Sequence, residues 1–509
     1  MDGATAPRKE NLMANSTNGR IAAVLTAALI ATTAWSPQVE AAGFAVARFG
    51  GEHGHPTTSN PTAIYYNPAG IMLNRGTNVF IDTSFALRWV GYDRPESAID
   101  NPLDPAVVGD DAAAAGLTAN SGKAELFNQA VVPFLGASSD FGTDWFSAGI
   151  AAYVPLGGSA VWSGNDAANA DLYPGSPDGV ARWYSIDGTI NSLYITTALA
   201  FHIEAANLSI GVSGSAIKSK MNTIRARNAD GTDDLVTLKG DGTTILKEGR
   251  SHLEADGWQA GIGAGIIWQP NESVWLGASY TSQPNLSGGM TLSGTLRNVL
   301  NTADPSETNI EVTQTLPDII RLGARVRPEG WNAEIRLFMD YTRWSVFENQ
   351  CILNADEPSR NCDFAGSENA LEDPAGYTSG EDFNGVVQNL PRFWKDSVGI
   401  RFGGSYWLKD ELELYLGAGY DSSAVPPETM DPALFDLEKV TATAGTRWQA
   451  SELFGLGVTF TQVFYFELDT EGRSINPHYA PGTNTVQTSA DGVYSQSVSV
   501  LNVYTEFTF

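Results

Sequence analysis

Residues 497–509, at the C-terminus of the chain, read SVSVLNVYTEFTF. Polar and apolar side chains alternate along this stretch, which is typical of a β-strand with two different faces. We expect one face to meet lipid and the other to face a lumen. The lipid set comprises Val503, Thr505, Phe507 and Phe509, and the lumen set comprises Asn502, Tyr504, Glu506 and Thr508. The stretch is longer than an average soluble strand and long enough to cross a bilayer at a tilt.

An open sheet edge cannot persist in lipid, because its amide groups would lack hydrogen-bond partners. A sheet built from such strands must therefore close into a barrel. Many outer-membrane barrels also end in phenylalanine, and we expect Phe509 to be part of a signal to the barrel assembly machinery.

The same alternation recurs along the chain and predicts fourteen strands. They lie at residues 77–90, 125–138, 145–155, 184–203, 207–221, 252–268, 273–283, 309–326, 332–347, 394–407, 411–421, 437–448, 453–468 and 493–509. Tight connections at 140–144, 204–206, 269–272, 328–330, 409–410 and 449–452 alternate with long ones at 91–124, 156–183, 222–251, 284–308, 348–393, 422–436 and 469–492. Short turns at one end and long loops at the other are typical of outer-membrane barrels. We therefore predict an all-β fold, a 14-stranded antiparallel transmembrane β-barrel over residues 77–509.

The N-terminus has the pattern of a secretory signal. Residues 21–34, IAAVLTAALIATTA, form an apolar run behind Arg8, Lys9 and Arg20, too short to span a bilayer as a helix. Small residues at Val39 and Ala41 fit a cleavage site, so we assign residues 1–41 to a signal peptide. The start codon, Met1 or Met13, stays open.

The formal net charge of −28 argues against nucleic-acid binding, because phosphate attraction requires basic groups. Acidic loops serve either solubility or the binding of divalent cations that bridge anionic surface lipids such as lipopolysaccharide. We predict no cofactor and no metal site; His53 and His55 lack a third ligand. No Gly-x-Ser-x-Gly elbow or paired carboxylates indicate an enzyme.

The two cysteines, Cys351 and Cys362, lie in one predicted loop. In an oxidising exported compartment they are expected to form a disulfide rather than a metal site, because no histidine lies near them.

Residues 60–72, NPTAIYYNPAGIM, have no place in a strand ladder or a helix interior, because each proline lacks an amide donor. Fourteen strands enclose a lumen too wide for barrel side chains to fill. We therefore expect residues 42–76 to form a hatch, or plug, inside the barrel.

Several segments resemble the FadL family of outer-membrane transporters for long-chain fatty acids and hydrophobic compounds. They are AGF at 42–44, YYNPAGI at 65–71, TLPDIIRLGARV at 315–326, DYTRWSVF at 340–347 and residues 394–436. The resemblance implies a hatch carrying Asn67, Pro68 and Ala69, with Gly43 and Phe44 at its tip near the ligand.

The resemblance also implies a route. Ligand is caught among the outer loops, moves to a deeper pocket and leaves sideways through a kink in the third strand. Pro155, Gly157 and Gly158 are residues that interrupt a ladder; they either form this kink or merely end the strand.

The substrate stays open between long-chain fatty acids and neutral aliphatic or aromatic hydrocarbons. Arg225 and Arg227 could pair with a fatty acid carboxylate, but exposed loop positions are the alternative. A general porin with an open lumen, or an adhesin resting on the acidic loops, are further alternatives.

Overall fold

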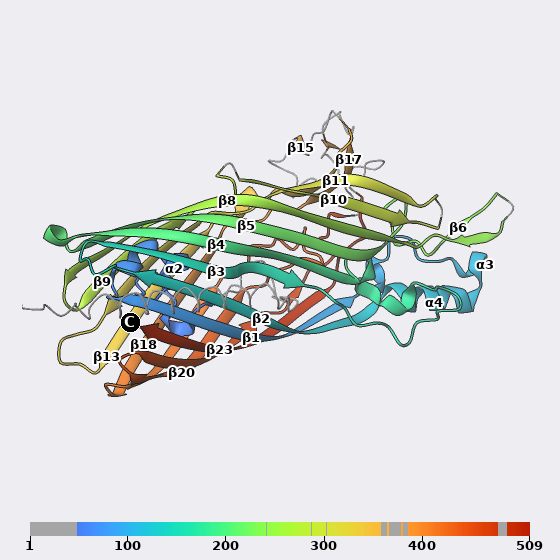
Figure 1. Ribbon diagram of the computed structural model, residues 1–509. Helices are drawn as coiled ribbons and strands as arrows, with labels where there is room; N and C mark the ends of the chain where they lie inside the picture. The colour runs from blue at the N-terminus through green and yellow to red at the C-terminus, as the bar shows by residue number, and fades with distance from the viewer. Residues whose placement is uncertain are drawn as a thin grey trace, which may run out of the picture.

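A computed structural model shows a closed barrel of fourteen antiparallel strands, drawn in Figure 1. The structure describes residues 48–240, 242–286, 288–301, 303–357, 364–365, 378–379, 385–476 and 486–509. Within these ranges no helix is long and apolar enough to cross a membrane. The proposed signal peptide and the tip residues Gly43 and Phe44 lie outside the described residues.

The wall begins with β1 (Thr77–Arg94), which pairs on one side with β2 and on the other with the last strand, so the sheet closes on itself. The following strands are β2 (Gly122–Ser139), β3 (Phe146–Ser159), β4 (Asp187–Ile203), β5 (Leu208–Arg227) and β8 (Gly249–Asn271). The last wall strands are β19 (Leu412–Asp421), β20 (Lys439–Ser451), β21 (Phe454–Tyr465) and β23 (Val493–Thr508).

Strands seven to ten of the barrel are each built from two segments. They are β9 (Val274–Thr281) with β10 (Gly289–Val299), β11 (Ser306–Thr315) with β12 (Ile319–Val326), β13 (Ala333–Thr342) with β14 (Asn349–Asn354), and β17 (Val386–Pro391) with β18 (Ser397–Lys409). The predicted long loop at 284–308 is therefore wrong, because β10 and β11 occupy most of it. Parts of 91–124, 156–183, 222–251 and 348–393 are likewise strand. The sheet extends beyond the apolar band, where alternation no longer marks it in sequence.

The six tight turns are confirmed, and they gather at the end of the barrel that also holds the C-terminus (Figure 1). We call this the turn end and the opposite end the loop end. The loop end carries α3 (Pro105–Val108), α4 (Asp110–Asn120), the two-stranded β6 (Val236–Leu238) and β7 (Thr244–Leu246), and short 3-10 turns at η3 (Glu96–Ala98), η4 (Ser176–Asp178) and η5 (Val180–Trp183). β4 begins at Asp187, three residues after the predicted start of the fourth strand at 184. Smaller pieces are η6 (Glu204–Ala206), η7 (Trp344–Val346), β15 (Phe364–Ala365), β16 (Thr378–Ser379) and β22 (Leu468–Asp469).

The two faces predicted for the last strand are confirmed. Asn502 donates to the Arg48 backbone oxygen at 3.0 Å and Tyr504 contacts His53 at 2.6 Å, so both point into the lumen. Phe509 is 53% exposed on the other face.

The N-terminal segment lies inside the turn-end half of the barrel as η1 (Gly51–His53), α2 (Ala63–Tyr66) and η2 (Pro68–Met72) (Figure 1). Proline at the first position of η2 suits a turn start, where an amide has no partner to lose. Phe49, Ile64 and Ile71 are buried, and Phe49 packs edge-on against Tyr65 at 5.2 Å. The segment thus has a small apolar core of its own that also packs on the wall.

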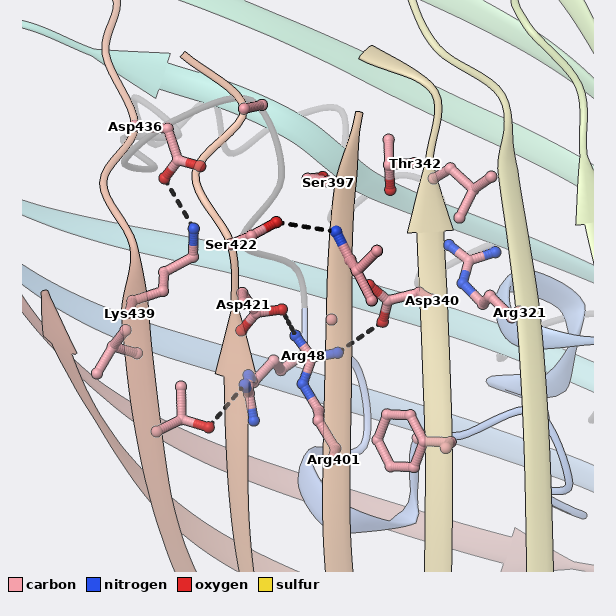
Figure 2. A pocket seen from close by; sticks show the side chains of 18 of the residues that line it. Arg48, Arg321, Asp340, Thr342, Ser397, Arg401, Asp421, Ser422, Asp436 and Lys439 are labelled. Atoms are coloured by element: carbon pink, nitrogen blue, oxygen red, sulfur yellow. Dashed lines mark hydrogen bonds and ion pairs between the residues drawn. The ribbon is translucent and has the colours of Figure 1, made fainter. Parts of the chain in front are cut away.

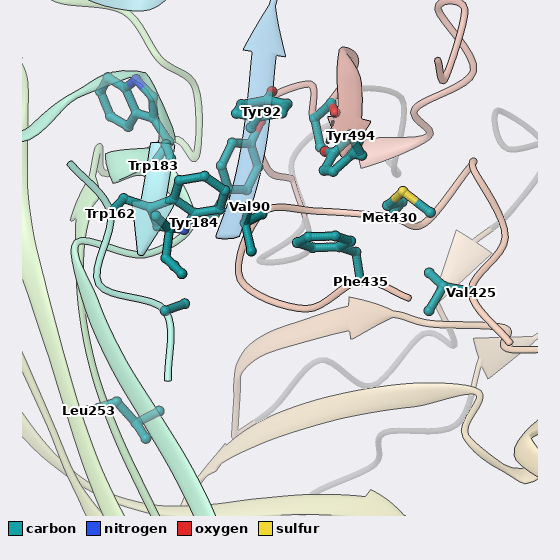
Figure 3. Packing of buried hydrophobic residues seen from close by; sticks show 14 of the residues in the cluster. Val90, Tyr92, Trp162, Trp183, Tyr184, Leu253, Val425, Met430, Phe435 and Tyr494 are labelled. Atoms are coloured by element: carbon teal, nitrogen blue, oxygen red, sulfur yellow. Dashed lines mark hydrogen bonds between the residues drawn. The ribbon is translucent and has the colours of Figure 1, made fainter. Parts of the chain in front are cut away.

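A second apolar cluster closes the lumen toward the loop end (Figure 3). It is formed by side chains from distant loops and strand ends, among them Tyr92, Trp162, Trp183, Tyr184, Met430, Phe435 and Tyr494. We call it the outer cluster. Its largest loop contribution comes from residues 160–184, between β3 and β4, and residues 422–436, between β19 and β20, also turn inward to join it.

Candidate functional site

Within the outer cluster lies a cavity of about 140 Å³, which we call the upper cavity. Its wall is mainly aliphatic and aromatic, contributed by Ala160, Ile190, Met221, Leu253, Leu296, Val312, Ile352, Leu390, Leu434 and Phe435. These side chains come from opposite sides of the barrel, so the cavity spans the lumen. Its chemistry suits an apolar molecule.

One side of the upper cavity carries guanidinium groups. Arg225, on β5, donates to Gln388 and, at 3.2 Å, to Gln487. Arg227, two residues further along β5, donates to Gln388 at 2.8 Å and lies next to the upper cavity without lining it. Neither guanidinium forms an ion pair with a carboxylate among the described residues. By contrast, Arg392 pairs with Asp431 at 2.7 Å.

The third wall strand leaves its neighbour halfway along its length. β2 and β3 pair from Ser139↔Ala148 to Phe134↔Tyr153, and the ladder stops there. The pairing of β3 with β4 shifts its register from Tyr153 to Leu156, the residues that flank Pro155. Beyond this shift the two strands stay paired as far as Ser159↔Thr189. A proline without an amide hydrogen at this point explains the bulge. β3 therefore stays attached to β4 while its edge toward β2 is left without a ladder; we call this stretch the β2–β3 gap.

Gly158 and Ser159, on the part of β3 that has no ladder with β2, line the upper cavity together with the next residue, Ala160. Pro155 and Leu156 line a smaller cavity below, which also touches Tyr65 and Pro68 of the hatch. Both cavities thus border the gap.

A third cavity has a different chemistry (Figure 2). It lies beside the hatch against strands eight to twelve and is lined by ion pairs. Arg401 pairs with Asp340 at 2.6 Å and Asp421 at 2.7 Å, and Lys439 pairs with Asp436 at 2.7 Å. We call it the polar cavity. Arg48 of the hatch reaches its wall by donating to Thr441 at 3.2 Å.

The hatch is tied to the wall by polar contacts at both ends. Gly50, in the left-handed region at φ 75°, donates its amide to Asp82 at 2.7 Å. His53 contacts Glu413 at 3.0 Å and Tyr504 at 2.6 Å. Asn67 is fully buried and donates to the backbone oxygens of Pro56 and Ile266. These contacts hold the hatch in the lumen.

Acidic side chains also close the loop end. Asp233 pairs with the buried Arg94 at 2.6 Å, and Asp100 accepts from the Asp233 amide at 3.3 Å. Asp100 also accepts from Thr488 at 3.0 Å. We call this group the loop clasp, because it joins three loops. Burial raises the pKa of the Asp100 carboxyl to about 6, and the Asp233 carboxylate adds to the rise.

The structure brings together most of the predicted site residues. Asn67, Pro68 and Ala69 lie in the hatch, and Pro155, Gly157 and Gly158 lie along the gap. Arg225 is in β5 and half-buried at the upper cavity, so its assignment to an exposed loop is wrong. Cys351 is buried and disulfide-bonded, whereas Cys362 lies outside the described residues, so their pairing stays a prediction.

Sequence reasoning missed Arg88, Asn128 and Arg392, which reach the gap or the upper cavity from three different elements. Arg88 and Asn128 occupy lumen positions of predicted strands, where apolar residues are also common. A buried arginine at a lumen position is the signal that could have singled out Arg88.

Fold and site define a class of protein: a closed barrel of the outer-membrane type, with a plug and an apolar cavity in its lumen. A family model described as "Outer membrane protein transport protein (OMPP1/FadL/TodX)" matches residues 22–509, and the chain belongs to this family. It is accordingly a protein of the outer membrane and of a family of transport channels for hydrophobic compounds.

Solved structures share the fold at low sequence identity. A Pseudomonas aeruginosa FadL homologue has 15% identity and a TM-score of 0.68, covering 92% of this chain and 100% of that one. The Ralstonia pickettii toluene transporter TbuX has 14% identity and a TM-score of 0.53, covering 92% and 97%. The P. putida toluene transporter TodX has 12% identity and a TM-score of 0.54, covering 88% and 94%. A search of curated protein sequences gave no match.

Proposed function

We propose that this channel performs passive, ligand-gated uptake of long-chain fatty acids or related hydrophobic compounds, which leave sideways through the β2–β3 gap. One observation carries the proposal: Gly158 and Ser159, in the stretch of β3 that has no ladder with β2, line the upper cavity together with the next residue, Ala160. An apolar molecule in the cavity therefore lies next to an interruption of the wall.

The height of the gap supports an exit into lipid. Trp89 and Phe127 point outward from β1 and β2 with ring centroids 5.2 Å apart, as expected of an aromatic girdle at the membrane surface. The gap begins beside Phe127 and runs from there toward the turn end. It thus faces the lipid side of the girdle.

The polar cavity argues against a straight route past the hatch. Its wall presents the Arg401, Asp340, Asp421, Lys439 and Asp436 ion pairs. An apolar chain that displaced water from these charges would incur their desolvation cost. Lateral exit avoids this cost because the molecule passes from an apolar cavity to lipid.

Arg225 and Arg227 favour a fatty acid over a neutral hydrocarbon. Guanidinium groups beside an apolar cavity, with amide partners but no described carboxylate, suit an anionic headgroup. The second candidate is a small aromatic hydrocarbon. The upper cavity, at about 140 Å³, favours it by size, because an engineered protein cavity of about 150 Å³ binds benzene.

Binding experiments separate the two substrates. In Arg225→Gln we expect the affinity for palmitate to fall by about 10- to 100-fold, the loss of a hydrogen bond to a charged group, while methyl palmitate and toluene bind as before. Isothermal titration on the detergent-extracted channel measures this, and Arg473→Gln in an outer loop is the matched control. Toluene binding with no palmitate binding would establish the hydrocarbon alternative. Mass spectrometry of co-purifying lipids gives an independent answer.

A cross-link tests lateral exit. Asn128 Nδ2 lies 3.0 Å from the Ser159 oxygen, so cysteines at these two positions are within reach of a short, reducible thiol cross-linker. We expect the cross-linked channel to lose uptake and to regain it on reduction. The control pair is Ala86→Cys with Ala130→Cys, which face each other on the intact β1–β2 ladder. Uptake that persists through the cross-linked gap would exclude this exit.

A further inference from the structure

The edge of β3 at the gap is held by side chains instead of a strand. Ala160, the residue after the end of β3, exchanges both of its backbone hydrogen bonds with Gly188, at the start of β4, at 2.8 and 3.2 Å. Because successive residues in an extended chain direct their backbone groups to opposite edges, the Ser159 carbonyl points toward β2. Below this point the ladder with β2 is missing, so the carbonyl needs another donor.

Two side chains supply that donor. Asn128, on β2, donates its Nδ2 to the Ser159 oxygen at 3.0 Å, and Arg88, on β1, donates its Nη1 to the same oxygen at 3.1 Å. Both side chains are buried, with exposed fractions of 7% and 8%. One carbonyl of β3 is thus joined to two neighbouring strands of the wall.

The ends of the gap are closed in a different way. At the loop end, the amide of Ser163 donates to the Glu125 oxygen at 2.7 Å, and the Glu125 amide donates to Ser163 Oγ at 3.0 Å. At the turn end, the ladder resumes at Phe134↔Tyr153. Between these two points the contacts of Arg88 and Asn128 with Ser159 cross the gap.

The same two groups also face the ligand space. Arg88 and Ser159 both line the upper cavity. The Arg88 guanidinium is further held by Gln496, at 3.0 and 3.3 Å, and lies 5.7 Å from the Phe435 ring centre. Asn128 keeps a buried Oδ1 without a hydrogen-bond partner. The Asn128 amide is thus only partly satisfied, and the Ser159 carbonyl to which Arg88 donates is a neutral acceptor.

We propose that Arg88 and Asn128 form a latch on the Ser159 carbonyl, and that the carboxylate of a bound ligand opens the gap by taking Arg88 from it. An ionised carboxylate forms shorter and stronger hydrogen bonds to a guanidinium than a peptide carbonyl does. Once Arg88 turns to the ligand, Asn128 alone holds the edge of β3. The latch rests on the proposed function, since it needs a ligand with an anionic headgroup in the upper cavity.

Distances across the gap test the latch. Spin labels at Gln129→Cys on β2 and Leu193→Cys on β4 are both on the outer face and have β3 between them. The control pair, Leu193→Cys with Trp258→Cys, has the uninterrupted β5 between its labels, with Lys218 paired to both positions. The channel is reconstituted in nanodiscs, and pulsed electron resonance records each distance distribution.

Palmitate is expected to shift part of the Gln129–Leu193 distribution to longer distances by about one inter-strand spacing, roughly 5 Å. Methyl palmitate, of the same chain length without the charge, should leave it unchanged. Arg88→Met should show the longer component without any ligand, whereas Arg225→Gln should not. The control pair should stay constant throughout.

Two results would overturn the latch: bound palmitate with an unchanged distribution, or an equal shift with methyl palmitate. Arg88→Met with the same distances as the unsubstituted channel would also contradict it, provided that its heat-modifiable migration shows a folded barrel. Failure of the proposed function looks different, because palmitate would then neither bind in titrations nor enter cells. Uptake with a fixed gap distance therefore rejects the latch alone.

Discussion

At the scale of single residues, the hatch is fixed by a few buried polar atoms. Asn67 joins the hatch to two strands of the wall through the oxygens of Ile266 and Ala278, and its Oδ1 accepts from Ala69. The wall leaves room for it: a Cβ on Gly265 would lie 2.0 Å from Asn67 Oδ1. Glycine at 265 thus has a packing reason, as its place inside a strand indicates.

Asn67→Ala should loosen the hatch without unfolding the barrel. The substitution leaves buried carbonyl oxygens without a donor, at a cost of about 1–3 kcal/mol each. We expect faster hydrogen exchange at hatch amides such as that of Ala69, measured by mass spectrometry. Asn74→Ala, in a half-buried part of the same segment, is the control. Unchanged exchange in Asn67→Ala would show that apolar packing alone holds the hatch.

The loop clasp should respond to pH. An Asp100 carboxyl with a raised pKa favours the closed clasp when it is protonated. The closed clasp therefore has its full stability below about pH 4, the ordinary pKa of an aspartate carboxyl. It loses this stability as the pH rises through about 6, the raised pKa of Asp100. A rise of about two pKa units corresponds to a loss of about 3 kcal/mol in the stability of the closed clasp at pH 7. Hydrogen exchange of the Asp233 and Ser489 amides, corrected for intrinsic rates, should show that the loop clasp opens more often at pH 7 than at pH 5. Asp100→Asn should remove this difference.

At the scale of elements, the strands do two jobs. Fully paired strands such as β1 build the wall, while β3 loses its ladder with β2 halfway along and so leaves an edge within the barrel. Strands seven to ten continue past a break as a second, outer set of segments. In that outer set β14 and β17 form a short pair that carries the disulfide-bonded Cys351.

We expect the disulfide to stabilise this outer pair and not the barrel. Closing a ring of about ten residues contributes on the order of 3 kcal/mol, which corresponds to about a 100-fold change in local exchange. Reduction should therefore speed exchange in β14 and β17 and leave β1–β2 unchanged. Peptide mapping without reductant identifies the disulfide partner of Cys351, and a cross-linked Cys351–Cys362 peptide is the expected product. Global unfolding on reduction would contradict a local role.

At the scale of the whole molecule, the barrel is a cylinder blocked twice, by the hatch toward the turn end and by the outer cluster toward the loop end (Figures 1 and 3). The upper cavity lies within the outer cluster, and the polar cavity lies beside the hatch.

Conductance measures this directly. The intact channel should be nearly silent in planar bilayers, because hatch and outer cluster fill the lumen. Deletion of residues 42–72 together with shortening of the inward loop 422–436, which removes both blocks, should give a conductance at least about tenfold larger, since a barrel of fourteen strands is too wide to be filled by its own side chains. A large, persistent conductance of the intact channel would instead support the porin alternative. Heat-modifiable migration of the deletion variant verifies that its barrel is folded.

The sequence by itself determined the barrel. Alternation in strands such as 497–509, with short turns between every second pair, predicts closure in lipid because unpaired amides are costly there. The irregular hatch segment followed from the Asn-Pro dipeptides around Asn67, whereas the kink in β3 was implied by the resemblance to the FadL family, with Pro155, Gly157 and Gly158 as its candidates. Each of these signals is local in the chain, so it can be read without coordinates.

Only the tertiary structure decided the site. The strand segments beyond the apolar band were not predicted, because the alternation of polar and apolar residues weakens where both faces of a sheet are exposed to water. The upper cavity joins Arg225 of β5, Leu390 of β17 and Phe435 of a distant loop. The latch joins Arg88 and Asn128 to Ser159, residues of three strands. Such contacts depend on register and on loops folding inward across the lumen, which no local pattern encodes.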